Sequence, residues 1–377
     1  MDLPTTLLVT NDFPPRVGGI QRTLEALVRE MPTDRIAVFC PDAEDSAAYD
    51  ATVPFRVLRQ PEPFLWPTPR IGDRIEEAAN DLGAEVLMFG ATYPLALLGP
   101  RLAGRGLPYL AAAHGFEYWL SIAPATHALM RHATSRASRV PVLCSRFIAR
   151  TVRTAVPREV PVSVLYPGAD VERFRPDLET REIRSRHGIG ERPLVVCVSR
   201  LVRRKGQDVL ILAMPAIRAR VPEATLLIVG GGPDDARLRT LARSAPAGSV
   251  VFTGEVPEEA LPGHYAAGDV FAMPCRTRLG GLEVEGWGNV FIEAAACGRP
   301  VVVGDSGGAR EALVDGETGV LVDGRRVEEV ASAVAGLLAD PGLARKMGEA
   351  GRERVVRSYT WPRIAERLAI WLGAAAR

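Results

Sequence analysis

The chain has 377 residues, of which 47% are hydrophobic and 24% charged, and its net charge is +1. This length predicts two domains of roughly 150–200 residues, and the near-neutral charge provides no field that would select for nucleic acid. The five cysteines are scattered, which argues against a disulfide framework. The sequence contains no apolar stretch of about 18 residues, as a membrane span would need, and no basic, apolar leader follows Met1-Asp2, as a signal peptide would need. We therefore expect a cytoplasmic protein.

The N-terminal half alternates short apolar runs with segments of helical spacing. We expect strands at residues 7–9, 36–40, 53–58, 86–89, 109–113, 140–144 and 162–165. Alternation of this kind predicts a parallel, doubly wound sheet, whose ligands bind at the carboxyl ends of the strands.

The first of these strands runs into a turn rich in proline and glycine. Gly18 and Gly19 stand directly before a run of helical spacing that starts at Ile20. Because glycine lacks a Cβ atom, the backbone N–H groups of this turn could approach a phosphate closely. A plain turn between strand and helix fits the sequence about as well. The Gly-x-Gly-x-x-Gly fingerprint of dehydrogenases is absent.

Histidines follow the fifth predicted strand. His114 stands directly after the strand at 109–113, a position that suits a ligand contact as well as a structural role. Further on, residues 125–139 combine His127, Arg131 and His132 with apolar side chains. This tract could rest on anionic lipid, although a solvated helix face is the more common explanation.

A charged, proline-containing stretch at 173–192 is interpreted as the linker to a second series of strands and helices. Strands are expected at residues 194–198, 226–229, 251–256, 270–273 and 301–303, with a last strand pair at 319–323. Helices are expected to begin near Gln207 and to cover residues 327–338, 343–356 and 361–375.

Two cations stand five positions apart in the loop after the strand at 194–198. Arg200 and Lys205 precede the start of a helix and suit a diphosphate, since Arg binds oxygens in pairs and Lys acts as a point charge. A basic loop is ordinarily just solvated, and Arg203 and Arg204 are expected to be exposed in this way.

Two glutamates organise the stretch from 281 to 308. Glu285 is expected in a loop and Glu293, eight positions later, about one turn inside a helix. The free N–H groups of the first helical turn lie between them. Carboxylates accept sugar hydroxyls and a helix start accepts phosphate oxygens, so this stretch suits a ligand that carries both.

Two further sequence features bear on rival functions. Residues 304–308 match the Gly-x-Ser-x-Gly elbow of α/β-hydrolases, but every histidine of the chain precedes Ser306, whereas a hydrolase places its histidine after the serine. An Asp-x-Asp pair is absent from the sequence, and the basic groups could neutralise a diphosphate instead. We therefore expect no obligatory metal and no required cofactor.

Several strings resemble those of retaining, nucleotide-sugar-dependent glycosyltransferases of the GT-B type, a family marked by two glutamates with seven residues between them. The strings are NDFPPR with GGIQ, SRLV with RKGQD, IVGGGP, FAMPCRTR and VEG-G. The resemblance implies an α/β GT-B fold, in which two Rossmann-like domains with doubly wound parallel sheets face a central cleft. Residues 1–170 would form the acceptor side and 171–360 the nucleotide-sugar side, with the helix 361–377 crossing back.

The resemblance also implies roles for individual residues. The catalytic set would be Arg200, Lys205, Glu285 and His114. Donor contacts would come from Gly18, Gly19, Val256, Gly288, Asn289, Val290 and Glu293. Acceptor contacts would come from Asp12, Phe116 and Tyr118. Several relatives carry a second histidine where this chain has Phe116, a departure that bears on the acceptor.

Within the family, the strings are similar to those of actinobacterial mannosyltransferases. The function expected from this is transfer of mannose from GDP-mannose to a phosphatidylinositol mannoside, with peripheral contact to the anionic inner face of the membrane and no nucleic-acid partner. The alternative is a related retaining enzyme with another nucleotide sugar and a small soluble or natural-product acceptor. A non-catalytic nucleotide-binding module is a more remote alternative.

Overall fold

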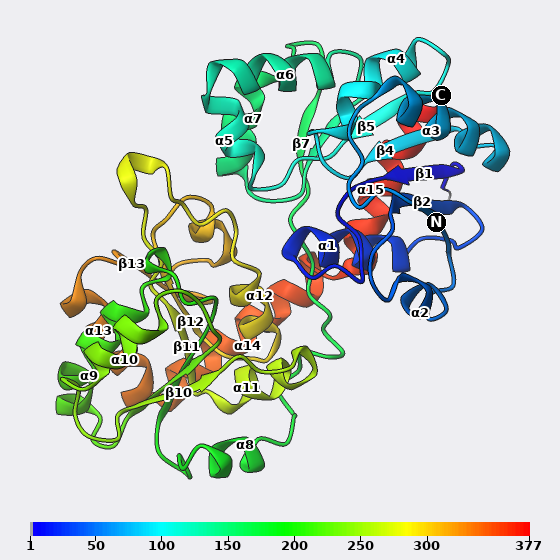
Figure 1. The fold of residues 1–377 in the computed structure, drawn as a ribbon. Helices are drawn as coiled ribbons and strands as arrows, with labels where there is room; N and C mark the ends of the chain where they lie inside the picture. Colours follow the sequence, from blue (N-terminus) through cyan, green and yellow to red (C-terminus); the bar gives the residue numbers. More distant parts are fainter. Residues whose placement is uncertain (1–2) are drawn as a thin grey trace. The chain divides into compact units, whose positions relative to one another are not determined.

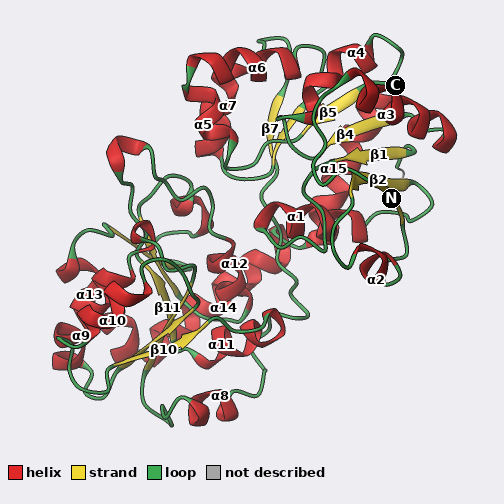
Figure 2. Ribbon diagram, in the orientation of Figure 1, coloured by secondary structure: helices red, strands yellow, loops and turns green. Residues whose placement is uncertain are grey.

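The computed structural model describes residues 3–377 and divides the chain into two compact units (Figure 1). The first unit comprises Met1–Pro167 with Trp361–Arg377, and the second comprises Gly168–Thr360. Met1 and Asp2, from which the expectation about a signal peptide started, lie outside the described residues. Each unit is an α/β structure built on its own parallel sheet (Figure 2).

The first unit contains a parallel sheet in the order β3-β2-β1-β4-β5 and a parallel pair β6-β7. The strands are β1 (Thr6–Val9), β2 (Ile36–Pro41), β3 (Arg56–Gln60), β4 (Val86–Phe89), β5 (Tyr109–Ala111), β6 (Val140–Val142) and β7 (Val162–Val164). The helices are α1 (Gly19–Arg29), α2 (Ser46–Asp50), α3 (Pro69–Leu82), η1 (Leu95–Leu98), α4 (Gly99–Ala103), α5 (Glu117–Ile122), α6 (Pro124–Thr134) and α7 (Arg146–Ala155). The backbone N–H of Ala113 donates to the Pro141 carbonyl at 2.8 Å, which links β5 to β6.

The last helix, α15 (Trp361–Ala376), completes the core of the first unit although it lies at the end of the chain (Figure 1). Ile364, Leu368 and Leu372 recur at every fourth position, which places them on one helix face. They are buried in the same cluster as Leu8 of β1 and Leu24 of α1. The N-terminal sheet therefore depends on the C-terminal helix for one part of its apolar cover.

The second unit contains a six-stranded parallel sheet in the order β10-β9-β8-β11-β12-β13. The strands are β8 (Leu194–Val198), β9 (Thr225–Val229), β10 (Val250–Gly254), β11 (Val270–Met273), β12 (Val301–Gly304) and β13 (Gly319–Val322). The helices are α8 (Arg181–Arg186), η2 (Arg203–Lys205), α9 (Gln207–Arg220), α10 (Asp235–Ala242), η3 (Glu258–Ala260), α11 (Leu261–Ala267), η4 (Leu279–Gly281), α12 (Asn289–Ala296), η5 (Ala309–Ala312), α13 (Val327–Ala339) and α14 (Pro341–Ser358). The predicted doubly wound, parallel-sheet fold class is confirmed in both units.

Two expectations from the sequence are corrected here. The strand pair expected at 319–323 is one strand, β13, which ends at Val322 and pairs in parallel with β12. The charged stretch at 173–192 is not a free linker, because it contains α8 and belongs to the second unit. Arg184 explains the attachment, since its guanidinium donates to the Ala267 carbonyl at 3.0 Å and pairs with Asp269 at 3.1 Å.

Candidate active site

The centre of the second sheet is the point where the strand order reverses. β8 lies between β9 and β11, so the loops that follow β8 and β11 diverge at the carboxyl edge of the sheet. In open α/β sheets ligands bind in the crevice at such a switch point. The two loops carry Arg200–Gly206 and Pro274–Thr277. Two of the predicted catalytic residues, Arg200 and Lys205, therefore lie where the topology favours a ligand.

The loops after β8 and β11 are in direct backbone contact. The N–H of Arg276 donates to the Arg204 carbonyl at 2.8 Å. Gly206 has a φ of 81°, and a Cβ atom on it would lie 2.1 Å from the Pro274 carbonyl oxygen. Only glycine fits a left-handed backbone this close to another chain segment. The glycine of the RKGQD string therefore fixes the approach of the two loops.

Glu285 is buried and paired with two cations from the loop after β8. Its Oε2 atom lies 2.7 Å from Nζ of Lys205 and 2.5 Å from Nη1 of Arg204. Lys205 is also buried, whereas Arg204 is half-buried. The expectation that Arg204 is merely exposed is wrong, because the short helix η2 turns its side chain toward the carboxylate, while Arg203 is exposed as expected.

Charge determines the protonation state of Glu285. Burial alone would raise the pKa of this carboxyl, but Lys205 and Arg204 outweigh burial and hold its pKa below the ordinary value of 4.5. A buried carboxylate is tolerated when it is paired and hydrogen-bonded in this way. The carboxylate neutralises one of the two cations, so the cluster of Glu285, Lys205 and Arg204 keeps one net positive charge.

The loop that carries Glu285 is fastened to the turn after β12. The N–H of Glu285 donates to Oγ of Ser306 at 3.2 Å, and its carbonyl accepts from the N–H of Gly308 at 2.9 Å. Oγ of Ser306 also lies 3.1 Å from Oγ1 of Thr277. Ser306 is buried and positions a backbone, so the Gly-x-Ser-x-Gly match is structural and the hydrolase alternative receives no support.

A second ion-pair network braces the same region. Asp208, in the first turn of α9, accepts two bonds of 2.8 Å from Arg276 and one of 3.2 Å from Arg237. Burial acts to raise the pKa of Asp208, but these two arginines hold it below its ordinary value. Sequence reasoning missed this network, because the 68 positions between Asp208 and Arg276 leave no local signal.

Glu293, the second predicted glutamate, is positioned by a tyrosine. The hydroxyl of Tyr265, on α11, donates to Oε2 of Glu293 at 2.6 Å. Burial, reinforced by the Glu293 carboxylate, raises the pKa of Tyr265 well above its ordinary value, so the phenol stays a donor. Nothing in the sequence singled out Tyr265.

The helix start between the two glutamates has the predicted form. Gly288 precedes α12 with a φ of 85°, and a Cβ atom there would lie 2.6 Å from the Phe291 ring. Glycine is required for this approach, and it leaves the first helical turn, with Asn289 and Val290, without a capping side chain on its N-cap residue. Such a turn presents N–H groups to an anion or a hydroxyl.

Other predicted donor residues lie on neighbouring loops. Arg200 is exposed, and its carbonyl accepts from Nε2 of Gln207 at 3.1 Å. Val256 is half-buried and follows β10. The glycine turn after β9 packs on the loop after β8, because the Leu201 N–H donates to the Gly231 carbonyl at 2.8 Å. This backbone contact gives the glycines of the turn a structural role, because they allow the chain to turn sharply at the end of β9.

In the first unit, His114 lies buried at the carboxyl edge of the sheet. Its Nε2 atom lies 2.8 Å from the Gly90 carbonyl, and because a carbonyl oxygen only accepts, Nε2 donates the hydrogen of that bond. Its backbone N–H donates to Glu117 at 2.6 Å, and Glu117 also accepts from Thr92 at 3.2 Å. Glu117 and Thr92, neither of which sequence reasoning named, thus fix the backbone and surroundings of His114.

Asp12 shares the electrostatic surroundings of His114. Burial raises the pKa of its carboxyl, and His114 and Arg16 partly oppose this shift. Its Oδ1 atom accepts from Nε2 of Gln21, on α1, at 2.9 Å. Gly18 and Gly19 lie at the start of α1, where a Cβ atom on Gly19 would meet open space. At Gly18, by contrast, a Cβ atom would lie 2.2 Å from Oε1 of Gln21, so only Gly19 borders open space.

The two aromatic acceptor candidates differ in exposure. Phe116 is exposed, whereas Tyr118 is buried and stacks on Phe147 with ring centroids 5.8 Å apart. Of this pair, Phe116 is the residue that the fold presents to solvent.

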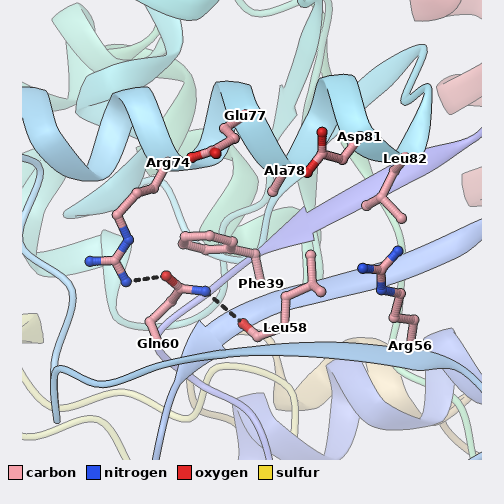
Figure 3. A pocket seen from close by; sticks show the side chains of 9 residues that line it. All are labelled: Phe39, Arg56, Leu58, Gln60, Arg74, Glu77, Ala78, Asp81 and Leu82. Atoms are coloured by element: carbon pink, nitrogen blue, oxygen red, sulfur yellow. Dashed lines mark hydrogen bonds between the residues drawn. The ribbon is translucent and has the colours of Figure 1, made fainter.

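The first unit and the second unit each contain a cavity. One of about 220 Å³ lies between α3 and the strands β2 and β3, with Phe39 and Leu58 beside the charged side chains of Arg56, Arg74 and Asp81 (Figure 3). It contains no predicted site residue. Another of about 410 Å³ is lined by Arg276, Thr277, Asp305, Leu321, Val322, Asp323, Arg325 and Glu329. Thr277 links this second cavity to Ser306 and so to the Glu285 loop.

The structure bears on metal binding, thiols and membrane spans within residues 3–377. Over this range no group of three or more His, Cys, Asp or Glu side chains is arranged to hold a metal ion, and the expectation of no obligatory metal stays a prediction. The five cysteines are buried, free thiols. None of the helices in this part of the chain combines the length and apolar character needed to cross a bilayer.

Two family models match this chain, one in each half. The model described as Glycosyl transferases group 1 matches residues 179–354, and the model described as Glycosyltransferase Family 4 matches residues 17–173. The first match falls within the unit that contains Glu285, and the second covers most of the unit that contains His114.

Curated relatives match over nearly the whole length. A protein of Mycolicibacterium smegmatis named GDP-mannose-dependent alpha-(1-6)-phosphatidylinositol monomannoside mannosyltransferase is 46% identical, over 96% of this chain and 97% of its own. A protein of the same name from Mycobacterium tuberculosis is 45% identical, over 97% of each chain. A Corynebacterium glutamicum mannosyltransferase that acts on the monoacylated form is 38% identical over 96% of each.

Solved structures share the fold at low identity. An Anabaena protein, HepE, determined in complex with UDP, superposes with a TM-score of 0.80 at 18% identity, over 98% of this chain and 100% of its own. A sucrose-phosphate synthase from Thermosynechococcus elongatus superposes with a TM-score of 0.74 at 22% identity, over 98% of both chains. Both superpositions cover nearly the whole chain and confirm the predicted fold of two α/β domains with parallel sheets.

Proposed function

The chain belongs to the glycosyl transferases group 1 family, and from this premise we propose that it transfers mannose from GDP-mannose to a hydroxyl group of a phosphatidylinositol mannoside. The observation that carries the proposal is identity of 45–46% to the mycobacterial enzymes of that name over 96–97% of this chain. Two independent clusters support the chemistry, the charged cluster at Glu285 and the buried set at His114.

We propose that the donor's diphosphate is bound at the switch point of the second sheet. Lys205 and Arg204 together with Glu285 carry one net positive charge, and the exposed Arg200 adds another. A diphosphate carries the opposite charge and gains more of it as the glycosidic bond breaks. Cations fixed in advance stabilise that developing charge without reorganisation. Lys205 is held in place by Glu285, so its position does not depend on the ligand.

The two glutamates and the start of α12 would hold the rest of the donor. Glu285 and the Gly288-Asn289-Val290 backbone are proposed to bind the sugar hydroxyls, and Glu293 the ribose hydroxyls. Glu293 is pre-oriented by Tyr265. In the first unit, His114 is proposed to contact the transferred sugar. The acceptor hydroxyl attacks from the leaving-group side and a diphosphate oxygen takes its proton, so the configuration at the anomeric carbon is retained.

We further propose that the protein works as a peripheral enzyme at the anionic inner face of the membrane and needs no divalent metal. The cations at the switch point can neutralise the diphosphate in place of a metal. The acceptor itself is a membrane lipid under this proposal, which requires the enzyme to reach a bilayer surface.

The test is a panel of sugar nucleotides scored first for slow donor hydrolysis and then for transfer, with products identified by mass. GDP-mannose together with a phosphatidylinositol monomannoside should give a product heavier by one hexose. The exposed Phe116, expected from the resemblance to stand where several relatives have a histidine, is the feature that would favour a different acceptor. If a soluble hydroxyl compound accepts mannose and the lipid does not, the alternative acceptor class is correct.

A further inference from the structure

We propose that the hairpin formed by residues 278–283 is a positioning element of the donor site, which holds Glu285 where it can accept hydroxyl groups of the donor's sugar. This inference rests on the proposed function, because it assigns a task to a segment beside the proposed sugar-binding carboxylate. The hairpin joins Thr277, in the loop after β11, to Val284, the residue before Glu285. Figure 1 shows its short helix η4, in yellow, at the end of a loop that extends from the six-stranded sheet.

The hairpin is closed at its base by Arg278 and Glu283. The N–H of Arg278 donates to the Glu283 carbonyl at 2.9 Å, and the N–H of Glu283 donates to the Arg278 carbonyl at 3.1 Å. The two side chains form an ion pair in which Nη1 of Arg278 lies 2.7 Å from Oε2 of Glu283. We call this pair of residues the clasp. Backbone and side chains together therefore fix where the chain leaves the hairpin, two residues before Glu285.

The tip of the hairpin has a backbone conformation that requires a fixed base. Leu279, Gly280 and Gly281 have φ values of 50°, 64° and 102°. A leucine in the left-handed region is strained, and such strain persists only where the surrounding structure enforces it. The side chain of Leu279 is 61% exposed, so its packing provides little of this constraint. The constraint comes from the backbone, which the clasp closes.

Both ends of the hairpin are tied to one buried serine. Oγ of Ser306 lies 3.1 Å from Oγ1 of Thr277 and accepts from the N–H of Glu285 at 3.2 Å. Gly307, the next residue, has a φ of 56°, and a Cβ atom on it would lie 2.3 Å from the Glu285 carbonyl oxygen. The segment from Thr277 to Glu285 is therefore a closed loop on Ser306, and the clasp links its two arms.

The position of the backbone matters because the Glu285 carboxylate is already held at one oxygen. Lys205 and Arg204 both contact Oε2. With Oε2 held, the direction of Oε1 depends on where the backbone of Glu285 lies. A hydrogen bond to a sugar hydroxyl tolerates only a small error in distance and angle. The clasp should therefore affect binding of the sugar, whereas Glu293 and Arg200, the proposed contacts of the nucleotide part, lie on other segments.

The test compares binding of GDP-mannose with binding of GDP by isothermal titration calorimetry, with the full-length protein and no acceptor. Arg278→Gln and Glu283→Gln should each weaken binding of GDP-mannose about fivefold and change binding of GDP by less than about 1.5-fold, because only the sugar meets Glu285. Arg186→Gln is the matched control, since it breaks an ion pair of 2.6 Å with Glu182 on α8 of the same unit. This control should bind both ligands as wild type does.

Two double variants test whether Arg278 and Glu283 act through each other. Arg278→Gln with Glu283→Gln should lose no more affinity for GDP-mannose than either single variant, because each removes the same link. Arg278→Glu with Glu283→Arg keeps both charges and should bind GDP-mannose within about twofold of wild type. If the two glutamine substitutions add, or if Arg278→Gln weakens GDP as much as GDP-mannose, Arg278 acts on the diphosphate directly and the assignment of the clasp is overturned.

Transfer assays keep this inference distinct from the proposed function. The single variants should raise the KM for GDP-mannose about fivefold and leave the KM for the acceptor unchanged. The side chains of the clasp are 26% and 35% exposed, so the circular dichroism spectrum and the melting temperature should match wild type. Unchanged binding of GDP-mannose in both single variants would overturn the inference while transfer itself stands. A wild-type protein that binds GDP-mannose but transfers mannose to no acceptor would overturn the proposed function instead.

Discussion

Nζ of Lys205 lies 2.7 Å from Oε2 of Glu285, although the two residues stand 80 positions apart and follow different strands. Both side chains are buried. The pair places a fixed positive charge beside a buried carboxylate, for which we propose a sugar-binding role, at one point of the sheet edge. Because both side chains are buried, the ion pair that sets the charge of the site also contributes to the stability of the fold.

The first prediction concerns acid stability. The Glu285 pKa is lowered in the folded protein, so its ion pairs stabilise the fold fully above about 4.5, its ordinary pKa, and this contribution is lost as the pH falls further toward the folded-state pKa. Glu285→Gln should therefore destabilise the protein at pH 7 and lose less stability than wild type on acidification. Urea unfolding at pH 7 and at about pH 4 measures this, and parallel curves for both proteins would contradict it.

The second prediction uses adjacent arginines as a matched pair. Arg204→Ala removes a cation that contacts Glu285 and should lower kcat about tenfold to a hundredfold. Arg203→Ala removes a neighbouring, exposed arginine whose nearest ion pair, with Asp234, spans 4.0 Å, and should leave kcat within about twofold. Steady-state transfer kinetics for both variants decide the matter. Equal losses would mean that overall positive charge matters and not the contact with Glu285.

The third prediction tests Arg200 as the stabiliser of the departing diphosphate. Arg200→Ala should lower kcat by about a hundredfold or more and leave the melting temperature unchanged, because the side chain is exposed. Arg200→Lys should recover only part of the rate, since Lys binds oxygens as a point charge. Near-normal turnover of the alanine variant would refute the role.

The fourth prediction concerns Tyr265, which the sequence did not single out. Tyr265→Phe removes the hydroxyl that donates to Glu293 at 2.6 Å and should raise the KM for the donor several-fold with little change in kcat. The loss of a buried bond to a charged group should cost about 1.5–3 kcal/mol of stability. Transfer kinetics and urea unfolding measure the two effects. An unchanged KM for the donor would contradict the proposed role of Glu293 in donor binding.

The fifth prediction is that transfer needs no divalent metal. After treatment with EDTA and desalting, the rate should stay within about twofold of the untreated enzyme, because Arg200, Lys205 and Arg204 supply the charge that a metal would bring. The control adds Mg²⁺ or Mn²⁺ back to the treated protein. Loss of activity that either ion restores would show a metal requirement.

The sequence predicted most elements because apolar runs are local signals. The strands at 86–89, 194–198 and 270–273 match the structure to the residue, and α9 begins at Gln207 as expected. The predicted bounds differ from the observed ones where an edge strand has few apolar residues. One example is β3, which was expected at 53–58 and spans Arg56–Gln60. The family strings also placed Glu285 and Lys205 among the site residues.

Only the tertiary structure decided which charges meet. Arg203 and Arg204 are equivalent by sequence, yet η2 turns Arg204, with Lys205, toward Glu285 and leaves Arg203 in solvent. The links from Tyr265 to Glu293, from Asp208 to Arg276 and from Glu117 to His114 arise in the same way. Local spacing determined the strands, helices and glycine turns, because they depend on neighbours along the chain. Ion pairs depend on segments that only folding brings together.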